Sequence, residues 1–491
     1  MHHCDGAMLG ILYMSQSKES QSSGEGLLNN HDELDHEDKL QRSLSNRHIQ
    51  LIAIGGAIGT GLFMGSGRTL SVSGTSVILT YMIIGFFFFF VMRAMGELLL
   101  SNLRYKSFTD FCTAYLGSWA GFFLGWSYWL SWVVAAIADM IVIGGYMQYW
   151  DPNLAPWIPA FATIIVLTGL NLLTVKLFGE MEFWFALLKI IAIVTFLCVS
   201  LYLIFTHFVS PNGTSATFSH LLDEKAMFPF GISGFFAGFQ IAIFSFIGIE
   251  LVGTTAAETK DPHKALPKAI NSIPVRIMLF YVAALICVVS VTSWSQISTE
   301  QSPFVQFFTL IGIPAAASLM NFVVATSAIS SANSGIFATS RMLFGLAAEN
   351  DADKCFAKLT KRKVPRNSLL FSMFLVVIGT SILFIVPNVM TAFTIISTFG
   401  SILVIFTFGL ILAAYLSYRR KAPELHEQST YKMPLGIFMS WTTLGFLLFG
   451  LVILALDKQT LIALAISPFW FLGLYFFYNK RAKKAKALQQ A

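Results

Sequence analysis

Long apolar segments recur along this chain and constrain its fold more than any other feature. From Ile49 onward, twelve segments come close to the ~20 residues that a helix needs to cross a bilayer. Only 12% of the residues are charged, whereas soluble domains carry about 25%. The sequence therefore predicts an all-α integral membrane protein with 12 transmembrane helices. The expected segments are 49–69, 76–100, 118–147, 155–175, 183–207, 234–256, 273–293, 312–340, 368–386, 390–417, 434–456 and 460–479.

The basic residues indicate how these segments are oriented. Cytoplasmic loops of membrane proteins carry an excess of Lys and Arg, and the even-numbered connections hold nearly all of them here. With an even number of spans, both termini are expected in the cytoplasm. The net charge of +6 follows the membrane and gives no sign of a nucleic-acid partner. The basic residues of these connections include Arg104, Lys106, Lys176, Lys260, Lys264, Lys268, Arg276, Lys354, Arg366, Arg419, Arg420, Lys421 and Lys480.

The first apolar segment contains an unusual density of glycine. Each glycine costs a helix interior about 1 kcal/mol relative to alanine, and a break in a spanning helix is tolerated where the freed backbone lines a protected cavity. Secondary transporters bind their substrates at such breaks. Glycines four residues apart also allow close helix packing, so this stretch alone is consistent with packing or with a binding site. The glycines are Gly55, Gly56, Gly59, Gly61 and Gly65.

The sixth segment supplies a second predicted break. Residues 244–250 read Phe-Ser-Phe-Ile-Gly-Ile-Glu, which puts a serine, a glycine and a carboxylate into one short apolar stretch. An uninterrupted helix is unfavourable with that composition. Segments one and six correspond to each other if spans 1–5 and 6–10 form an inverted repeat, and paired interruptions of this kind indicate a binding site. The second break therefore favours the binding-site interpretation of the first.

Several stretches resemble one family of membrane proteins, the amino acid permeases of the amino acid–polyamine–organocation (APC) superfamily. The resemblance extends from about Leu40 to the end of the last span. Within the family, the chain is similar to permeases that import small neutral amino acids such as glycine, D-alanine and D-serine, with L-alanine and L-serine as further candidates. The stretches that carry the resemblance are 46–67, 93–102, 176–186, 250–262, 332–343 and 431–436.

The resemblance implies an architecture and a division of the chain. The expected fold is a five-plus-five inverted-repeat core of the LeuT-like type, with helices 1 and 6 broken around the substrate. Residues 1–46 would form a disordered cytoplasmic tail, for which Met1 and Met14 are both candidate starts. Residues 47–417 would form the transport core, 418–479 spans 11 and 12, and 480–491 a basic cytoplasmic tail. The five cysteines are scattered, and no disulfide is expected.

The two breaks are expected to bind a zwitterion through the backbone. A helix start offers unpaired N–H groups and positive dipole to a carboxylate, which we assign to Gly59, Thr60 and Gly61. The free carbonyl groups of Ala57, Phe244 and Ile247 suit the ammonium, and Ser245 completes the expected site. The resemblance also implies that the Phe244 ring is a lid over the substrate, although one of 47 phenylalanines is equally typical of packing.

Charged residues inside the membrane are the candidates for energy coupling, because such residues are costly and mark functional sites. Glu250 either couples or gates transport or ties down the loose backbone of span six. Lys189 on span five is a proton-coupling candidate, and a snorkelling lysine is the alternative. The resemblance implies that Lys189 stands in for a cation between spans one, five and eight, beside Ser330 and Ser331. Asp139 on span three is either a structural partner or a proton site.

A secondary transporter and a non-transporting membrane enzyme or structural subunit are the two classes considered. An enzyme would need clustered His, Cys, Asp or Glu at catalytic or metal spacing, and no such cluster is evident in the sequence. No phosphate-binding glycine loop followed by lysine indicates a nucleotide-driven pump. The predicted protein is thus not an enzyme, needs no cofactor or metal, and has a neutral amino acid, a proton and the lipid bilayer of the cell inner or plasma membrane as its partners. Symport and exchange both remain open.

Overall fold

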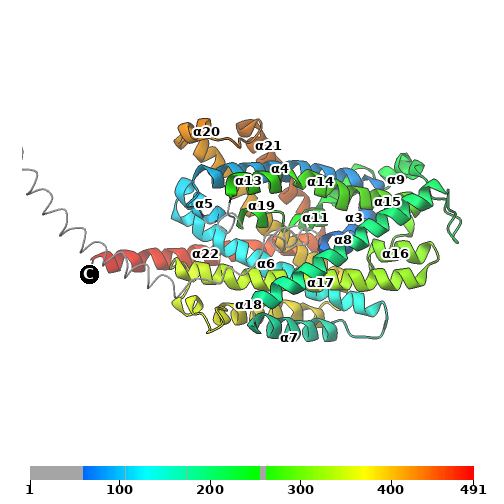
Figure 1. The fold of residues 1–491 in the computed structure, drawn as a ribbon, viewed down its shortest axis with the longest axis horizontal. Coiled ribbons are helices and arrows are strands. Elements are labelled where there is room, and N and C mark those ends of the chain that lie inside the picture. Colours follow the sequence, from blue (N-terminus) through cyan, green and yellow to red (C-terminus); the bar gives the residue numbers. More distant parts are fainter. Residues whose placement is uncertain (1–58, 106, 174, 255–260, 491) are drawn as a thin grey trace, which may run out of the picture.

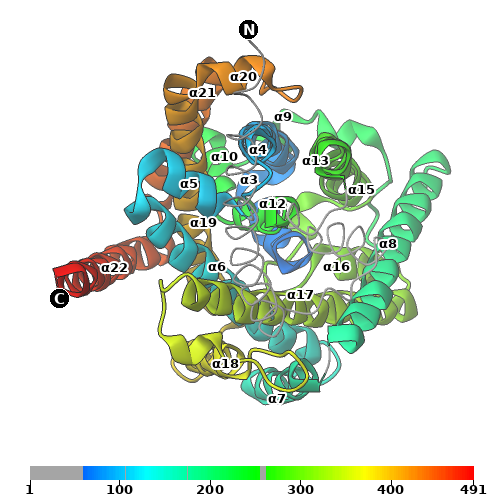
Figure 2. The same cartoon turned by 60° about the vertical axis from the view of Figure 1, so that its left-hand side comes forward.

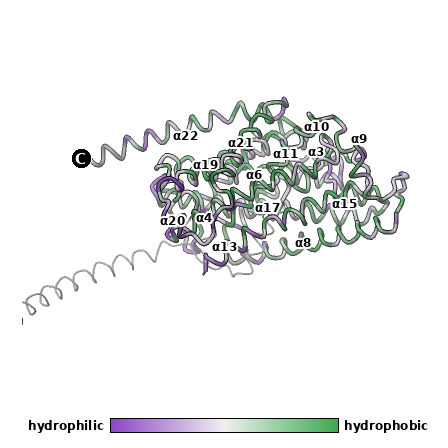
Figure 3. The backbone as a smooth tube through the Cα atoms, turned by 90° about the horizontal axis from the view of Figure 1, so that it is seen from above, coloured by the Kyte–Doolittle hydropathy of each residue, from purple (hydrophilic) through white to green (hydrophobic). Residues whose placement is uncertain are grey.

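The computed structural model describes residues 59–105, 107–173, 175–254 and 261–490, and they form a helical bundle. The long helices run side by side along the longest axis of the molecule (Figure 1). Apolar residues dominate their length, and hydrophilic residues gather toward the two ends of the bundle (Figure 3). The described residues contain no β-sheet, and the only pairing of this kind is one isolated bridge between Val209 and Ser215.

Ten helical segments of the described chain are long and apolar enough to cross a membrane, and Trp157–Leu173 is a shorter apolar helix. The coarse prediction of a multi-pass helical membrane protein is therefore confirmed. The main helices are α3 (Ser66–Ser73), α4 (Val77–Ser101), α5 (Phe108–Leu116), α6 (Ser118–Gln148), α7 (Trp157–Leu173), α8 (Val175–Phe205), α10 (Gly231–Ala237), α11 (Phe239–Ala242), α12 (Leu251–Thr254), α13 (Pro262–Asn271), α15 (Ala284–Val291), α16 (Pro303–Leu310), α17 (Pro314–Ala348), α18 (Arg366–Thr380), α19 (Val389–Lys421), α20 (Pro423–Gln428), α21 (Gly436–Leu454) and α22 (Lys458–Gln490).

The observed helices differ from the predicted segments at several places. The described part of the first predicted segment joins the second in one stretch, Gly61–Ser101, which is divided at Gly74 by a positive φ of 60° and a turn of 3₁₀-helix. Helix α8 begins eight residues before the predicted start at 183. Residues 480–490, expected as a tail, continue helix α22, which projects beyond the bundle (Figure 1). Residues 1–46 lie outside the described chain.

Helix α6 lies at the centre of the bundle. It packs against α17 and α19, and also against α5, α7, α18 and α22 (Figure 2). Aromatic and small residues occupy all sides of α6, and a helix that is apolar all round is a buried one. Trp129 is its largest fully buried side chain. Helix α22 instead exposes Phe469 and Phe476, as expected of a helix that faces lipid.

Candidate functional site

The polypeptide leaves regular helical geometry at the start of the described chain. The N–H groups of Leu62 and Phe63 both donate to the carbonyl of Gly59, each at 3.2 Å. Residues Gly61–Gly65 then form a widened π-helical turn, η1, before α3 continues. Ala57, one of the predicted site residues, lies outside the described residues.

The backbone of the sixth predicted span departs from regular α-helical geometry around residues 244–248. Helix α11 gives way to a 3₁₀ turn, η4 (Phe244–Phe246), and Ile247 then adopts extended backbone geometry with ψ of 132°. Gly248 has a φ of 106°, a conformation that glycine alone adopts readily. The Phe244 carbonyl accepts a hydrogen bond from Ile247 N at 3.1 Å. The sequence had suggested that this carbonyl is free, whereas in the structure it takes part in the turn.

The two interrupted segments lie against each other. A Cβ atom on Gly61 would stand 2.5 Å from Ser245 Cα and 2.9 Å from Ser245 N, a separation that no side chain tolerates. Gly61 is thus required for the close approach of η1 to η4. The Cβ position of Gly59 would meet only Ser331 Oγ, at 3.5 Å. There is thus space beside Gly59, whereas Gly61 lies directly against the backbone of Ser245.

Two tyrosines fix the position of Ser245. The Tyr281 hydroxyl donates to the Ser245 carbonyl at 2.8 Å, and the Tyr81 hydroxyl lies 3.0 Å from Ser245 Oγ. All three residues are buried. The sequence reasoning missed both tyrosines, although hydroxyl groups inside apolar spans are the natural partners of a broken backbone. They hold the η4 turn in place from α4 and from the π-helical turn η6 (Ile277–Ala283), which precedes α15.

Phe244 is buried and packs against α19. Its ring makes an edge-to-face contact with Phe393 at a centroid distance of 5.8 Å. A Cβ on Gly400 would stand 3.0 Å from the same ring, so Gly400 provides the space that Phe244 fills. The ring therefore lies between the interrupted sixth span and α19, where it closes one side of the region around Ser245.

The charged residues predicted for coupling are all buried. Thr60 Oγ1 donates to Asp139 Oδ1 at 2.7 Å, which ties the first break to α6. Lys189 is fully buried on α8 and interacts electrostatically with Asp139 and with Glu182. A snorkelling lysine would expose its ammonium at the membrane surface, whereas the Lys189 side chain is 0% exposed.

Ser330 and Ser331 lie on α17 but face different partners. Ser330 Oγ donates to Glu182 Oε1 at 2.8 Å, whereas Ser331 lies beside Gly59 at the first break. The sequence reasoning missed Glu182 because it began span five at residue 183. The signal was present, since residues seven apart lie on the same helix face and Glu182 precedes Lys189 by seven.

Glu250 is buried and clamps the second break. Its Oε2 accepts a hydrogen bond from Gly248 N at 3.0 Å, which is the tie to loose backbone that the sequence had left open. Its Oε1 and the hydroxyl of Tyr128 make no hydrogen bond of normal geometry among the described residues, but the two side chains interact with each other. One oxygen is therefore bonded to the backbone of the second break, and the carboxylate also interacts with Tyr128 on α6.

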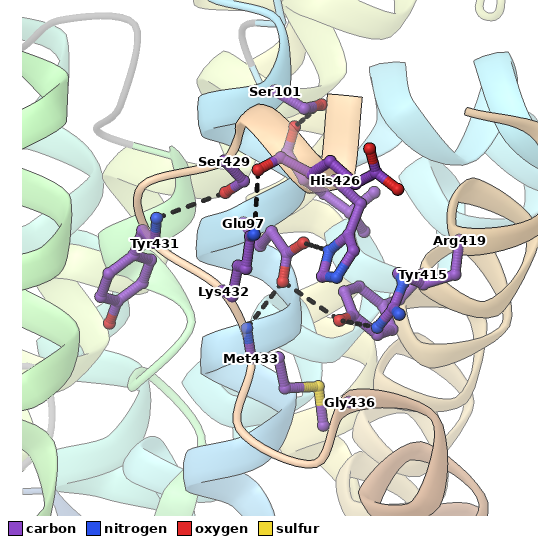
Figure 4. A network of polar contacts seen from close by, with 12 residues as sticks. Glu97, Ser101, Tyr415, Arg419, His426, Ser429, Tyr431, Lys432, Met433 and Gly436 are labelled. Carbon is purple, nitrogen blue, oxygen red and sulfur yellow. Dashed lines mark hydrogen bonds and ion pairs between the residues drawn. The ribbon is translucent and has the colours of Figure 1, made fainter. Parts of the chain in front are cut away.

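A further buried carboxylate, Glu97, lies outside this region and has both oxygens occupied. Its Oε2 accepts from Met433 N at 2.7 Å and from the Tyr415 hydroxyl at 3.1 Å. His426 Nδ1 lies 2.5 Å from its Oε1. Figure 4 shows these groups converging on Glu97 from α19, α20 and the segment before α21. Glu97 thus holds α4 to residues 415–433, and we call this set of contacts the Glu97 clip. In the sequence, Glu97 stood out only as part of the stretch 93–102.

The comparisons with known proteins point to one family. The family model described as amino acid permease matches residues 48–490. The D-serine/D-alanine/glycine transporter of Escherichia coli (strain K12) is 58% identical over 454 residues, which cover 92% of this chain and 97% of that protein. The DL-alanine permease SerP2 of Lactococcus lactis is 40% identical over 92% of this chain and 98% of its own. The aromatic amino acid transport protein AroP of Escherichia coli is 38% identical, with the same coverage.

Proposed function

Because the chain belongs to the amino acid permease family, we propose that it is a secondary active transporter that imports small neutral amino acids. Glycine, D-alanine and D-serine are the principal substrates, and L-alanine and L-serine are further candidates. The observation that carries the proposal is the 58% identity, over nearly the whole chain, to a D-serine/D-alanine/glycine transporter. The aromatic amino acid transporter is much less similar, at 38%.

The proposed architecture has twelve spans, of which the first ten form a five-plus-five inverted-repeat core. The interruptions at η1 and at Ile247–Gly248 support it, because they lie in the corresponding first and sixth elements. The distribution of Lys and Arg supports a plasma-membrane orientation with both termini in the cytoplasm. Residues 47–417 are the transport core in this proposal, and alternating access occurs around the two interruptions.

The proposed site lies where η1 meets η4. The N–H groups of Gly59, Thr60 and Gly61 bind the substrate carboxylate, because a helix start concentrates unpaired donors and positive dipole. The carbonyl groups of Ala57, Phe244 and Ile247 bind the ammonium. The space beside Gly59 and the extended geometry of Ile247 support these roles. Ser245, held by two tyrosines, positions the second segment.

We further propose that transport is proton symport, with Lys189 in the place of a bound cation. Its complete burial and its electrostatic interaction with Asp139 support this role. Asp139 contacts Thr60 at the first break, so a change at Lys189 has a short path to the substrate site. Ser331 beside Gly59 and Ser330 on the same helix would be the remnant of a cation site. Glu250 gates the second break, to whose backbone its carboxylate is bonded.

A competition panel tests the substrate assignment. The purified protein is reconstituted into liposomes, and uptake of labelled glycine from the outside is measured. Each unlabelled competitor is added outside in the same excess. D-alanine, L-alanine, D-serine and L-serine should compete, since packing alone separates a methyl from a hydroxyl poorly. Phenylalanine and tryptophan should compete weakly. Strong inhibition by tryptophan, or absence of glycine uptake by folded protein, would contradict the assignment.

A further inference from the structure

Three buried charged side chains form a row that starts at the first break. Asp139 on α6 is joined to Thr60, Lys189 on α8 interacts with Asp139, and Glu182 on α8 interacts with Lys189. Asp139 is 1% exposed, and Lys189 and Glu182 are 0% exposed. The row therefore passes from the candidate substrate site into α8 without reaching water at any of its members.

The charges of this row do not balance. Two carboxylates and one ammonium carry a net charge of −1 when all three are ionised, and an uncompensated charge inside a membrane is costly. The groups of α17 that face Glu182 are the neutral hydroxyls of Ser330 and Ser334. On α7, Asn171 is paired with Asn333 at 2.8 Å and is also neutral. Among the described residues, one additional proton is what makes the row neutral.

Glu182 has a free position for that proton. Its Oε1 accepts from Ser330, whereas its Oε2 faces the hydroxyl of Ser334 and makes no hydrogen bond of normal geometry among the described residues. Glu97 provides the contrast, because both of its oxygens are occupied by donors. A buried carboxylate with an unpaired oxygen is unstable as an anion, whereas a protonated one can donate to a neighbouring hydroxyl oxygen.

The position of Glu182 along α8 indicates to which side of the membrane the proton is released. It lies two helical turns, about 10 Å, from Lys189 on the side of Val175, where α8 begins. The basic residues put that end of α8 in the cytoplasm. Asp139, by contrast, contacts the first break directly. Glu182 is thus the member of the row that is farthest from the candidate substrate site and nearest the inner end.

We propose that Glu182 is the residue that carries the symported proton to the cytoplasmic side. One proton enters from the external solution with each substrate and binds the row, where it comes to reside on Glu182 Oε2. It leaves to cytoplasmic water when the inner side opens, and Lys189 remains an ammonium throughout. This inference rests on the proposed proton symport, and it assigns the transferred proton to a carboxylate.

Glu182→Gln is the central test, because it keeps the shape of the side chain and leaves Lys189 and Asp139 as a neutral pair. The full chain is reconstituted in liposomes, and two activities are measured with labelled glycine. Accumulation driven by external acid should fall by about tenfold, the effect of about 1.4 kcal/mol. Counterflow exchange, which moves no net proton, should persist within about threefold, and its dependence on pH should flatten. Glu182→Asp should recover part of the accumulation.

Glu180→Gln is the matched control, because it removes a carboxylate from the same helix two residues away, and it should accumulate glycine as the unmodified protein does. The proposed symport itself fails if the unmodified protein ignores the proton gradient. The assignment of Glu182 alone fails if the unmodified protein is proton-driven and Glu182→Gln still accumulates normally. It also fails if folded Glu182→Gln and Glu182→Asp lose exchange as completely as accumulation, since that result marks a purely structural role.

Discussion

At the scale of single residues, two glycines of the first predicted break have different surroundings. Gly61 lies against the backbone of Ser245, and Gly59 faces only the Ser331 hydroxyl. The glycine pattern in the sequence was compatible with packing and with binding. The structure gives the two glycines, which are two residues apart, different neighbours. Substitutions can therefore separate packing from binding.

Gly61→Ala is expected to push η1 away from η4. The new Cβ would stand 2.5 Å from Ser245 Cα, and overpacking of this kind costs about 1–3 kcal/mol. We expect a lower thermal midpoint in detergent and loss of glycine binding. Gly409→Ala is the control, because nothing lies within 4 Å of its Cβ position. Unchanged stability and uptake in Gly61→Ala would contradict the close approach of the two segments.

The sequence predicted the charged residues better than their partners. Lys189, Glu250 and Asp139 stand out because charge inside an apolar segment is visible in the sequence. Glu182 was missed because the apolar pattern put the start of span five one residue beyond it, and helix ends are poorly defined by hydrophobicity. The pairing of Ser330 with Glu182 depends on the packing of α8 against α17, which no local pattern determines.

At the scale of elements, a strap formed by residues 422–435 joins three parts of the bundle. Glu97 on α4 accepts from Met433 N and contacts His426. Arg93, one turn earlier on α4, donates to Asn271 of α13 at 2.9 Å and to the carbonyl of Lys432. Its guanidinium also lies 3.8 Å from the centre of the Tyr431 ring. The strap follows α19 directly and contacts α4, and Arg93 of α4 in turn contacts α13.

Glu97→Gln is expected to weaken this clip. The amide replaces an acceptor oxygen by a donor, so it leaves buried donors of the strap without a partner, at a cost of about 1–3 kcal/mol. We expect a lower thermal midpoint, measured by size-exclusion chromatography after heating, and faster proteolysis within the strap. Glu424→Gln, an exposed carboxylate on α20, should leave both unchanged. Equal stability of the two variants would show that the clip contributes nothing.

The elements themselves were largely predictable, and the strap was not. Helix α7 lies within two residues of its predicted bounds at each end, because the energy of burying an apolar segment is a local property of the sequence. The interruption at Ile247–Gly248 was likewise visible as a glycine and a carboxylate in an apolar run. The contact between Glu97 and His426 joins residues 329 apart in sequence, and it follows from the packed bundle.

At the scale of the whole molecule, the buried charges and the two breaks form one connected system. Thr60 links the first break to Asp139, and Asp139 interacts with Lys189. Gly61 links the first break to the second through Ser245. A rearrangement that changes the contact between η1 and η4 therefore reaches the charged row through a single hydrogen bond. In the proposed proton symport, this connection is the path by which a proton is coupled to substrate movement.

Energy coupling can be tested on the complete transporter. If two conformations bind the proton with different affinity, linkage requires that lower pH favours the one that binds it more tightly, and each tenfold difference corresponds to about 1.4 kcal/mol. Accumulation of glycine should collapse with a protonophore and remain when choline replaces sodium. Lys189→Ala should lose accumulation but retain exchange of substrate for substrate, since exchange needs no net proton transfer. A requirement for sodium, or accumulation by Lys189→Ala along a proton gradient, would exclude Lys189 as the residue that replaces the cation.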